Sequence, residues 1–336
     1  MGSADEVVAW LGAVQAQDFH GAKWALALRL RNATDESIDQ AFNDGIILRT
    51  HVLRPTWHFV IPEDISWLAE LTSPRVKAAN AYMQRELKLD NAVFSRSNRV
   101  LAKELSGRRY LTRLEIAKAL EDAGIKAEGL RLVYLIMHAE LDALICSGPR
   151  RGKQFTYALT NERAPHATSL DREEALGELA KRYFTGHGPA TLRDFVWWSG
   201  LTMNDARAGL EQAGSALNHE EIVGKKYWSS ARMKKGAEIP EQAFLLSTFD
   251  EFLVGYESYG SSRMGGPQNR KLMLYNSPVL IGGRVVGSWR RELEKDGILI
   301  SMALFTALPS PEIELINVAA KHYEKFYGLP VNCSIK

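Results

Sequence analysis

The sequence predicts an α+β protein that is mostly helical, with a small antiparallel β domain at its C-terminal end. Two observations predict this class. A pattern of helices followed by a β-hairpin occurs three times, at residues 1–61, 111–165 and 166–240, with a helical connector at 62–110. From residue 241 to 336 the pattern changes to β-rich segments and one closing helix. A length of 336 residues suits about two domains or an array of small ones.

The composition is that of an ordinary soluble globular protein, with 46% hydrophobic and 24% charged residues. The chain has no apolar signal core, and no run approaches the length of a membrane span, so we expect a cytoplasmic protein. Cys146 and Cys333 lie far apart, which argues for a reducing compartment and against a disulfide framework.

The first repeat opens with apolar residues at helical spacing, which predict a helix from about Ala4 to Gln15. A second apolar-rich segment covers Lys23–Leu30. Thr34 is expected to cap a further helix that ends at Gly45. These signals together predict short helices up to that glycine.

The hairpin that closes this repeat consists of Ile46–Leu53 and Thr56–Ile61 about the turn Arg54-Pro55. The connector that follows is basic. From Arg75 to Lys118 there are 11 basic and 4 acidic residues, so this segment is +7 and the rest of the +2 chain is −5. Such a local excess attracts a phosphate backbone. The alternative is a solvated helical face that binds nothing.

The second repeat begins with a capping box at Thr112–Glu115, in which each side chain satisfies a backbone donor of the other residue. Its hairpin has the basic tip Gly148–Lys153. The third repeat has the same kind of cap at Thr191–Asp194 and a hairpin tip at Gly224–Lys226. Both hairpins therefore end in lysine or arginine.

Helices followed by a basic-tipped hairpin are the layout of a winged helix, in which wing residues neutralise phosphates beside a groove. A repeated helical hairpin that binds no nucleic acid is the alternative, and the basic tips favour DNA. The residues that we expect to contact DNA are Arg108, Arg109, Arg113, Arg150, Arg151, Lys153, Lys225, Lys226, Trp289, Arg290 and Arg291.

The last region predicts a small antiparallel sheet covered by a helix. Its elements are the loop Gly260–Pro267, the strands Val279–Ile281 and Val285–Arg291 about the turn Gly282-Gly283, the strand Ile298–Phe305 and the helix Pro311–Phe326. Trp289 stands next to Arg290 and Arg291, a combination that minor-groove binders use. The alternative for Trp289 is core packing.

The stretch Gln15-Ala16-Gln17 carries the chemistry that we expect. On a regular helix, residues two apart point to opposite sides, so both amides reach one object only where the helix frays or turns extended. A glutamine can hold and aim a water but is a poor proton acceptor. Chemistry here should need a positioned water more than a strong base. The alternative is a solvated helix end.

Several further stretches carry a resemblance to a known family. They are Leu53–Val60, Gly188–Thr191 with Asp194–Leu201, Phe249–Phe252 and Gly287–Arg291. In these stretches, and over nearly its whole length, the chain resembles the winged-helix DNA glycosylases of the AlkZ/YcaQ type. The resemblance implies three tandem winged helices in a C-shape with an appended β domain. It also implies removal of bulky or cross-linked alkylated purines from double-stranded DNA.

In that family the catalytic pair is Gln-x-Gln, or Gln-x-Asp in the YcaQ branch, and Gln15-Ala16-Gln17 matches the first form. The resemblance therefore implies an AlkZ-like, monofunctional enzyme in which Gln15 and Gln17 position the attacking water. A purine alkylated at N7 or N3 is already cationic and leaves without a general acid. Positioning and electrostatics can lower the remaining barrier, so we expect no cofactor. We also expect a monomer.

Three residues near this chemistry are further candidates. Asp18 would add negative potential, or would serve as a helix cap or salt-bridge partner. Arg54 at the hairpin turn would contact a phosphate. His58 would approach the lesion or a phosphate, or would be a hairpin histidine whose hydrogen bonds are satisfied within the protein. For His51, on the facing strand, the second alternative is favoured. Trp57 and Trp197 lie in apolar runs and are expected in the core.

Two functions of other classes remain open. A non-catalytic winged-helix regulator predicts sequence-specific DNA binding without base release, and a protein-interaction scaffold predicts no salt-dependent DNA affinity. The sequence has no His-Glu-x-x-His and no paired cysteines, so we expect no metal site.

Overall fold

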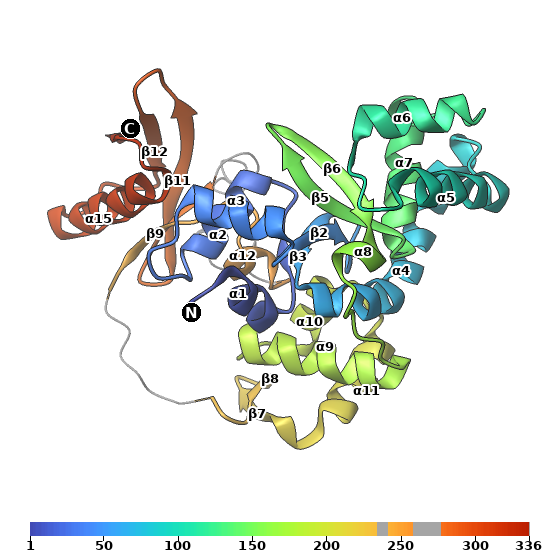
Figure 1. Ribbon diagram of the computed structural model, residues 1–336. Helices are drawn as coiled ribbons and strands as arrows, with labels where there is room; N and C mark the ends of the chain where they lie inside the picture. The colour runs from blue at the N-terminus through green and yellow to red at the C-terminus, as the bar shows by residue number, and fades with distance from the viewer. Residues whose placement is uncertain (234–240, 258–276, 336) are drawn as a thin grey trace. The chain divides into compact units, whose positions relative to one another are not determined.

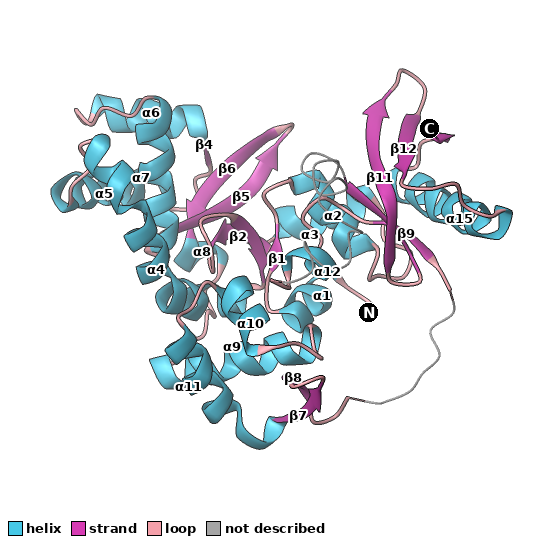
Figure 2. Ribbon diagram, turned by 180° about the vertical axis from the view of Figure 1, so that it is seen from behind, coloured by secondary structure: helices cyan, strands magenta, loops and turns pink. Residues whose placement is uncertain are grey.

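The computed structural model describes residues 1–233, 241–257 and 277–335 (Figure 1). Contacts divide the chain into two compact units. One, which we call the sheet unit, contains Met1–Ser3, Gln15–Asp39 and Arg232–Lys336. The other, the helical unit, contains Ala4–Val14 and Gln40–Ala231. The chain has mixed α+β structure, as predicted (Figure 2). The division into five segments stays a prediction, and residues 1–61 contribute to both units.

The first helix, α1 (Ala4–Leu11), is shorter than predicted. Gly12 adopts a φ of +80°, a left-handed conformation that ends a helix. The prediction of a helix up to Gln15 was therefore wrong. The strand β1 (Val14–Gln15) follows, and the chain passes from the helical unit to the sheet unit within it.

The hairpin of the first repeat is confirmed. Its strands β2 (Leu48–His51) and β3 (Trp57–Val60) pair antiparallel, in a sheet of order β1-β3-β2. The preceding helix α3 (Asp35–Asp44) begins after Thr34, whose Oγ1 accepts a 3.1 Å hydrogen bond from the Ser37 amide. Its predicted end at Gly45 is also confirmed, since this glycine has a φ of +80°.

The connector and the second repeat follow the predicted pattern. The connector contains η1 (Pro62–Asp64), α4 (Ile65–Glu86) and α5 (Asn91–Leu105). The second repeat contains β4 (Leu111–Thr112), α6 (Arg113–Asp122), α7 (Gly129–Leu141), β5 (Ile145–Arg151) and β6 (Gln154–Leu159), with sheet order β4-β6-β5. The capping box of Thr112 and Glu115 is present. One apolar cluster, which includes Phe94, Ile116 and Leu135, joins α5, α6 and α7.

The second repeat ends with α8 (Thr160–Arg163). The third repeat contains α9 (Arg172–Gly186), α10 (Leu192–Ser199), α11 (Met203–Ala213), η2 (Gly214–Ala216), β7 (Leu217–Ile222) and β8 (Lys225–Ser230). The capping box of Thr191 and Asp194 is confirmed, and Gly200 ends α10 with a φ of +69°. Trp198 is fully buried, but Trp197 is 52% exposed, so the prediction of a core role for Trp197 was wrong. Adjacent positions on a helix do not face the same side.

The sheet unit is built around five strands. Its elements are α2 (Phe19–Ala27), β9 (Ala243–Leu245), α12 (Glu251–Val254), β10 (Ser277–Ile281), β11 (Arg284–Leu293), β12 (Ile298–Leu304), α15 (Ser310–Tyr327) and β13 (Val331–Ile335). The strand order is β13-β12-β11-β10-β9, and the turn Gly282-Gly283 joins β10 to β11 as predicted. The predicted loop Gly260–Pro267 lies outside the described residues.

The predicted antiparallel sheet needs one correction, because β13 pairs with β12 in parallel. The helix α15 lies along the sheet (Figure 1) and contacts both edge strands, β9 and β13. Trp24 of α2 packs edge-to-face on Tyr323 of α15 at 4.8 Å and donates a 2.5 Å hydrogen bond to the Leu245 carbonyl. Aromatic packing therefore attaches α2 to the sheet.

Candidate functional site

The Gln-x-Gln pair lies on non-helical backbone. Gln15 is the second residue of β1, and Ala16 and Gln17 lead into α2, which begins at Phe19. The chain here therefore lacks the regular helical geometry that would place the two amides on opposite sides. Gln15 is buried, with 7% exposure, Ala16 is fully buried and Gln17 is exposed.

The backbone of Gln15 is held by a buried acid. Its amide donates a 2.7 Å hydrogen bond to Oε1 of Glu251, at the start of α12. The neighbouring Asp250 is fully buried and accepts two hydrogen bonds from the Arg29 guanidinium, at 2.7 and 3.0 Å. Burial alone would lower the pKa of Arg29, but this carboxylate outweighs it and the pKa is raised. The consecutive acids Asp250 and Glu251 thus bind the segment from Gln15 to Arg29 at its two ends.

These two acids were missed as functional candidates in the sequence, although Phe249-Asp250-Glu251-Phe252 is one of the motifs that carry the family resemblance. The available signal was a pair of acids between two phenylalanines. Charged residues in an apolar run are buried only when they are paired or hydrogen-bonded. That pattern indicates partners, but it does not say which ones.

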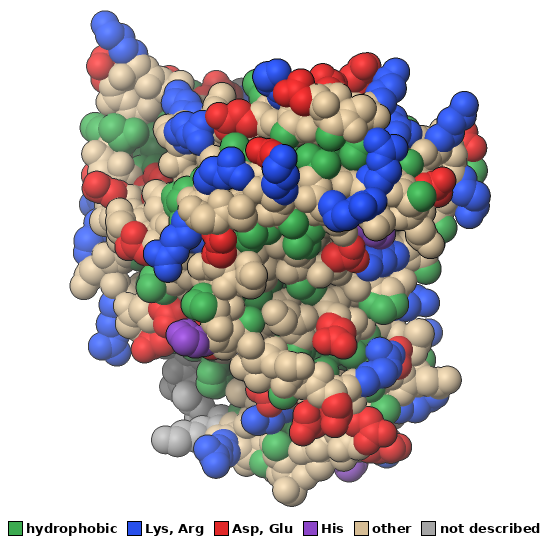
Figure 3. Space-filling view, turned by 45° about the vertical axis from the view of Figure 1, so that its right-hand side comes forward, with side chains coloured by type: hydrophobic (Ala, Val, Ile, Leu, Met, Phe, Trp, Pro, Cys, Tyr) green, Lys and Arg blue, Asp and Glu red, His purple; other side chains and the backbone are tan. Residues whose placement is uncertain are grey.

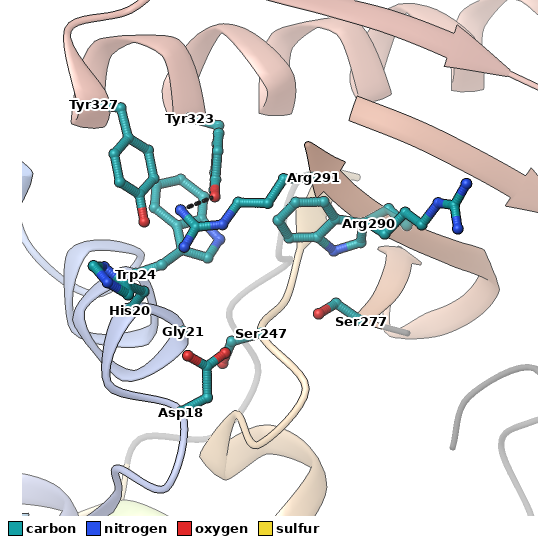
Figure 4. A pocket seen from close by; sticks show the side chains of 11 residues that line it. Asp18, His20, Gly21, Trp24, Ser247, Ser277, Arg290, Arg291, Tyr323 and Tyr327 are labelled. Carbon is teal, nitrogen blue, oxygen red and sulfur yellow. Dashed lines mark hydrogen bonds between the residues drawn. The ribbon is translucent and has the colours of Figure 1, made fainter. Parts of the chain in front are cut away.

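Directly after the pair, a pocket of about 140 Å³ opens within the sheet unit (Figure 4). It is lined by Asp18, His20, Gly21, Trp24, Ser247, Ser277, Trp289, Arg290, Arg291, Tyr323 and Tyr327. Figure 4 shows Asp18 beside Ser247 and Gly21, and Arg291 beside the two tyrosines of α15. The pocket therefore has an acidic side and a basic side.

Asp18 stands at the N-cap position of α2, the place expected if it served as a helix cap. Its side chain, however, makes no capping hydrogen bond. Among the described residues it has no ion-pair partner either. Gly21 leaves room for it, because a Cβ at that position would lie 2.5 Å from the Asp18 carboxylate. The carboxylate is therefore exposed at the pocket and adds negative potential there.

The basic side of the pocket is formed by Arg291 of β11. Its guanidinium donates a 3.1 Å hydrogen bond to the Tyr323 hydroxyl and lies 5.0 Å from the Tyr327 ring centre. Burial, and next the positive charges of Lys23 and Arg291, lower the pKa of His20, so that this histidine is neutral near pH 7.

Trp289 is 5% exposed, and its indole donates a 2.9 Å hydrogen bond to the Leu246 carbonyl. The structure therefore has the core packing that the sequence left open for Trp289, and the expectation that this side chain enters a DNA groove is corrected. The reason is its place in the middle of β11, six residues beyond Gly283, rather than at the tip of the hairpin.

The other reaction-site candidates lie in the helical unit. His58 is buried, with Nδ1 3.0 Å from the Thr56 carbonyl oxygen. His51 is buried too, with Nδ1 2.6 Å from a Glu140 oxygen. Arg54 donates a 3.4 Å hydrogen bond to the Trp197 carbonyl. Roles of Arg54 and His58 in the reaction stay predictions.

The wing-tip residues of the helical unit differ in how far they are engaged. Arg151 forms a 2.8 Å ion pair with Glu115 and donates to the Tyr110 carbonyl, and Arg150 lies over the Phe155 ring. The tip residues Lys153, Lys225 and Lys226 are exposed. Arg151 must therefore exchange a carboxylate for any phosphate that it binds.

The end of the basic connector shows the same contrast. Arg109 donates to the carbonyls of Ser106 and Lys103 at the end of α5, so it caps this helix. Arg108 and Arg113 are exposed. Figure 3 shows lysine and arginine side chains on one face with acidic side chains among them. Within the basic segment, Lys77 pairs with Asp142 and Lys118 with Asp122, so part of its excess charge is compensated locally.

The described part of the chain contains no group of three or more His, Cys, Asp or Glu side chains that could hold a metal ion. Within the same residues, no helix is both long enough and apolar enough to cross a membrane.

Comparisons with known proteins agree over most of the chain. The family model described as "DNA glycosylase AlkZ-like" matches residues 8–326. A curated protein of Streptomyces sahachiroi, "Interstrand DNA cross-link repair glycosylase", is 24% identical over 351 residues, which cover 96% of this chain and 89% of that protein. The solved structure of Streptomyces sahachiroi DNA glycosylase AlkZ is similar in fold, with a TM-score of 0.79 and 22% identity over 99% of this chain and 94% of that one.

Proposed function

Because this chain belongs to the AlkZ-like DNA glycosylase family, we propose that it hydrolyses the N-glycosidic bond of purines alkylated at N7 or N3 in double-stranded DNA. The family confirms the predicted enzyme class. Bulky and interstrand cross-linked purines are the substrates that we propose first, because the Streptomyces sahachiroi relative is described as an interstrand cross-link repair glycosylase.

The reaction that we propose needs little acid–base chemistry. The bond between C1′ and the purine nitrogen breaks, and its electron pair goes to the already cationic base, which leaves neutral. Positive charge develops on the sugar, water adds to C1′, and a proton passes to solvent. Catalysis then consists of holding the water and stabilising the sugar cation.

The observation that carries this proposal is the placement of the Gln-x-Gln pair. It stands on non-helical backbone and is followed directly by Asp18, whose carboxylate lines a pocket. We propose that Gln15 and Gln17 hold the attacking water and that Asp18 stabilises the positive sugar. Two neutral amides suit this role, because an amide offers both donors and an acceptor and does not titrate.

We propose that the DNA backbone is held by exposed basic residues of the helical unit. They are Arg108, Arg113, Lys153, Lys225 and Lys226, with Arg150 and Arg151 at the wing and Arg109 near the end of α5. We also propose that the three hairpins β2–β3, β5–β6 and β7–β8 are the wings of three winged-helix modules. The expectation of a cytoplasmic monomer rests on the sequence alone and stays a prediction.

The test is base release from a duplex with a single N7-alkylguanine, detected as an abasic site. The wild type should release the base. Gln17→Ala should be slower by about 100-fold or more, because displacement of a reacting group costs that much. An exposed glutamine is a suitable control, and Gln40→Ala on α3 should react like the wild type. Sequence-specific binding of undamaged DNA without base release would instead favour the regulator.

A further inference from the structure

The guanidinium of Arg291 is held but not neutralised. Among the described residues its hydrogen-bond partner is the Tyr323 hydroxyl, and no carboxylate lies within ion-pair distance. The ring of Tyr327 supports it at 5.0 Å. A guanidinium has five N–H donors, so the described residues of the sheet unit leave some of its donors and its charge available. Such an arginine is oriented in advance for an anion.

The neighbouring Arg290 also lines the pocket, but its guanidinium is not held by the two tyrosines. Arg290 is exposed and lies 3.3 Å from Glu292. Successive residues of a strand face opposite sides, and Figure 4 shows Arg290 pointing away from the tyrosines that hold Arg291. The two arginines thus have the same chemistry but different surroundings.

The remaining lining fits a small anion. Ser247 and Ser277 contribute hydroxyl groups, and His20 is the third polar group near the basic side. The volume of about 140 Å³ is below the range of roughly 300–1,000 Å³ of pockets that enclose a whole drug-sized ligand. A planar guanidinium fork matches the paired oxygens of a phosphate. On the basic side of the pocket, Arg291 would repel a cationic alkylated base and attract an anion.

We propose that this pocket binds one phosphodiester group of the DNA backbone beside the damaged nucleotide, with Arg291 as its ligand and Tyr323 and Tyr327 as positioning residues. The inference rests on the proposed function, because it places Asp18 near the sugar of the same nucleotide. A pocket with a cation at one side and a carboxylate at the other then matches a nucleotide whose phosphate is anionic and whose sugar becomes cationic.

The experiment measures binding without catalysis. A duplex with a tetrahydrofuran abasic analogue is prepared in versions that each replace one phosphate near the analogue with an uncharged methylphosphonate. For the wild type, one position should weaken binding by roughly tenfold or more, which is the size of a charge-assisted hydrogen bond. In Arg291→Gln this loss should disappear, while losses at other positions remain. In Arg284→Gln, a control at an exposed arginine of β11 that does not line the pocket, the wild-type profile should persist.

A milder variant keeps the inference testable if Arg291→Gln does not fold. Tyr323→Phe removes only the hydroxyl that orients the guanidinium, so the loss at that same position should shrink. An Arg291→Gln profile identical to the wild type overturns the inference. A second measurement is protection of Arg291 from a guanidine-reactive reagent. The inference is also overturned if millimolar inorganic phosphate protects Arg291 but the duplex does not.

The result is separable from the proposed function. An Arg291-dependent phosphate position in a protein that releases no alkylated base would retain the pocket and reject the glycosylase mechanism. If the wild type releases the base but Arg291→Gln leaves the methylphosphonate profile unchanged, the glycosylase mechanism is retained and the phosphate pocket is rejected.

Discussion

The amide of Gln15 donates a 2.7 Å hydrogen bond to a carboxylate oxygen of Glu251, 236 positions later in the chain. Both residues are buried. The backbone N–H of the first residue of the proposed catalytic pair is therefore bonded to an acid in a short helix of the sheet unit. Glu251 does not need to touch the substrate to affect the reaction, because it helps to hold the backbone N–H of Gln15 in place.

Glu251→Ala should destabilise the protein and slow base release together. An unsatisfied buried amide costs about 1–3 kcal/mol, and the pair loses its anchor. Glu251→Gln keeps an acceptor oxygen and should recover part of both losses. Urea unfolding and single-turnover base release measure the two effects. Glu36→Ala, at an exposed glutamate of α3, is the control. Unchanged release by Glu251→Ala would contradict the anchoring role.

Gly21→Ala should slow base release without loss of stability. Alanine is a better helix former than glycine by about 1 kcal/mol, but its Cβ would lie 2.5 Å from the Asp18 carboxylate and displace it. The measurement is a double-mutant cycle with Asp18→Ala. In the Asp18→Ala background, Gly21→Ala should have no further effect on the rate. Equal effects in both backgrounds would show that the glycine acts through another contact.

Glu115 predicts a pH dependence of stability. Its hydrogen bonds with the Thr112 backbone, then those with Arg151, lower its pKa from 4.5 to about 2. A pKa that is lower in the folded state gives stability that is present above the unfolded value and lost as pH falls towards the folded one. The difference in urea midpoint between wild type and Glu115→Gln should therefore be constant near neutral pH and shrink between pH 4.5 and 2. A difference independent of pH would exclude this coupling.

The same substitution should strengthen DNA binding. Glu115→Gln preserves the capping box, since glutamine also serves there, but it removes the charge that holds Arg151. The released arginine should raise duplex affinity by up to about fivefold at low salt, the value of an exposed ion pair. Titrations at several salt concentrations measure this. Arg151→Gln should lower the affinity, and the double variant should gain nothing from the loss of Glu115.

Local signals in the sequence predicted much of the fold. The capping boxes at Thr112 and Thr191 and the helix end at Gly200 were predicted correctly because cap chemistry involves only neighbouring residues. The end of α1 was placed too late because the apolar spacing continued past Gly12. The orientation of β13 was missed because parallel pairing depends on a distant strand.

The candidate site was predictable only in part. The Gln-x-Gln pair and Asp18 are adjacent in sequence, so a motif identifies them. Glu251 and the pocket residues Arg291 and Tyr323 come from segments more than 200 residues away, and only folding brings them to this segment. The sequence likewise did not decide whether Trp289 packs in the core, because a strand with both apolar and basic residues does not reveal which of its faces is buried.

The passage of the chain from one unit to the other within β1 affects how the protein matures. Residues 15–39 belong with the chain after residue 231, not with the helix that precedes them. During synthesis the helical unit can therefore assemble around α1 before α12, β11 and α15, which pack with the proposed catalytic segment, leave the ribosome. A prematurely terminated product would contain the helical unit without the proposed catalytic site, and we expect it to release no bases from DNA.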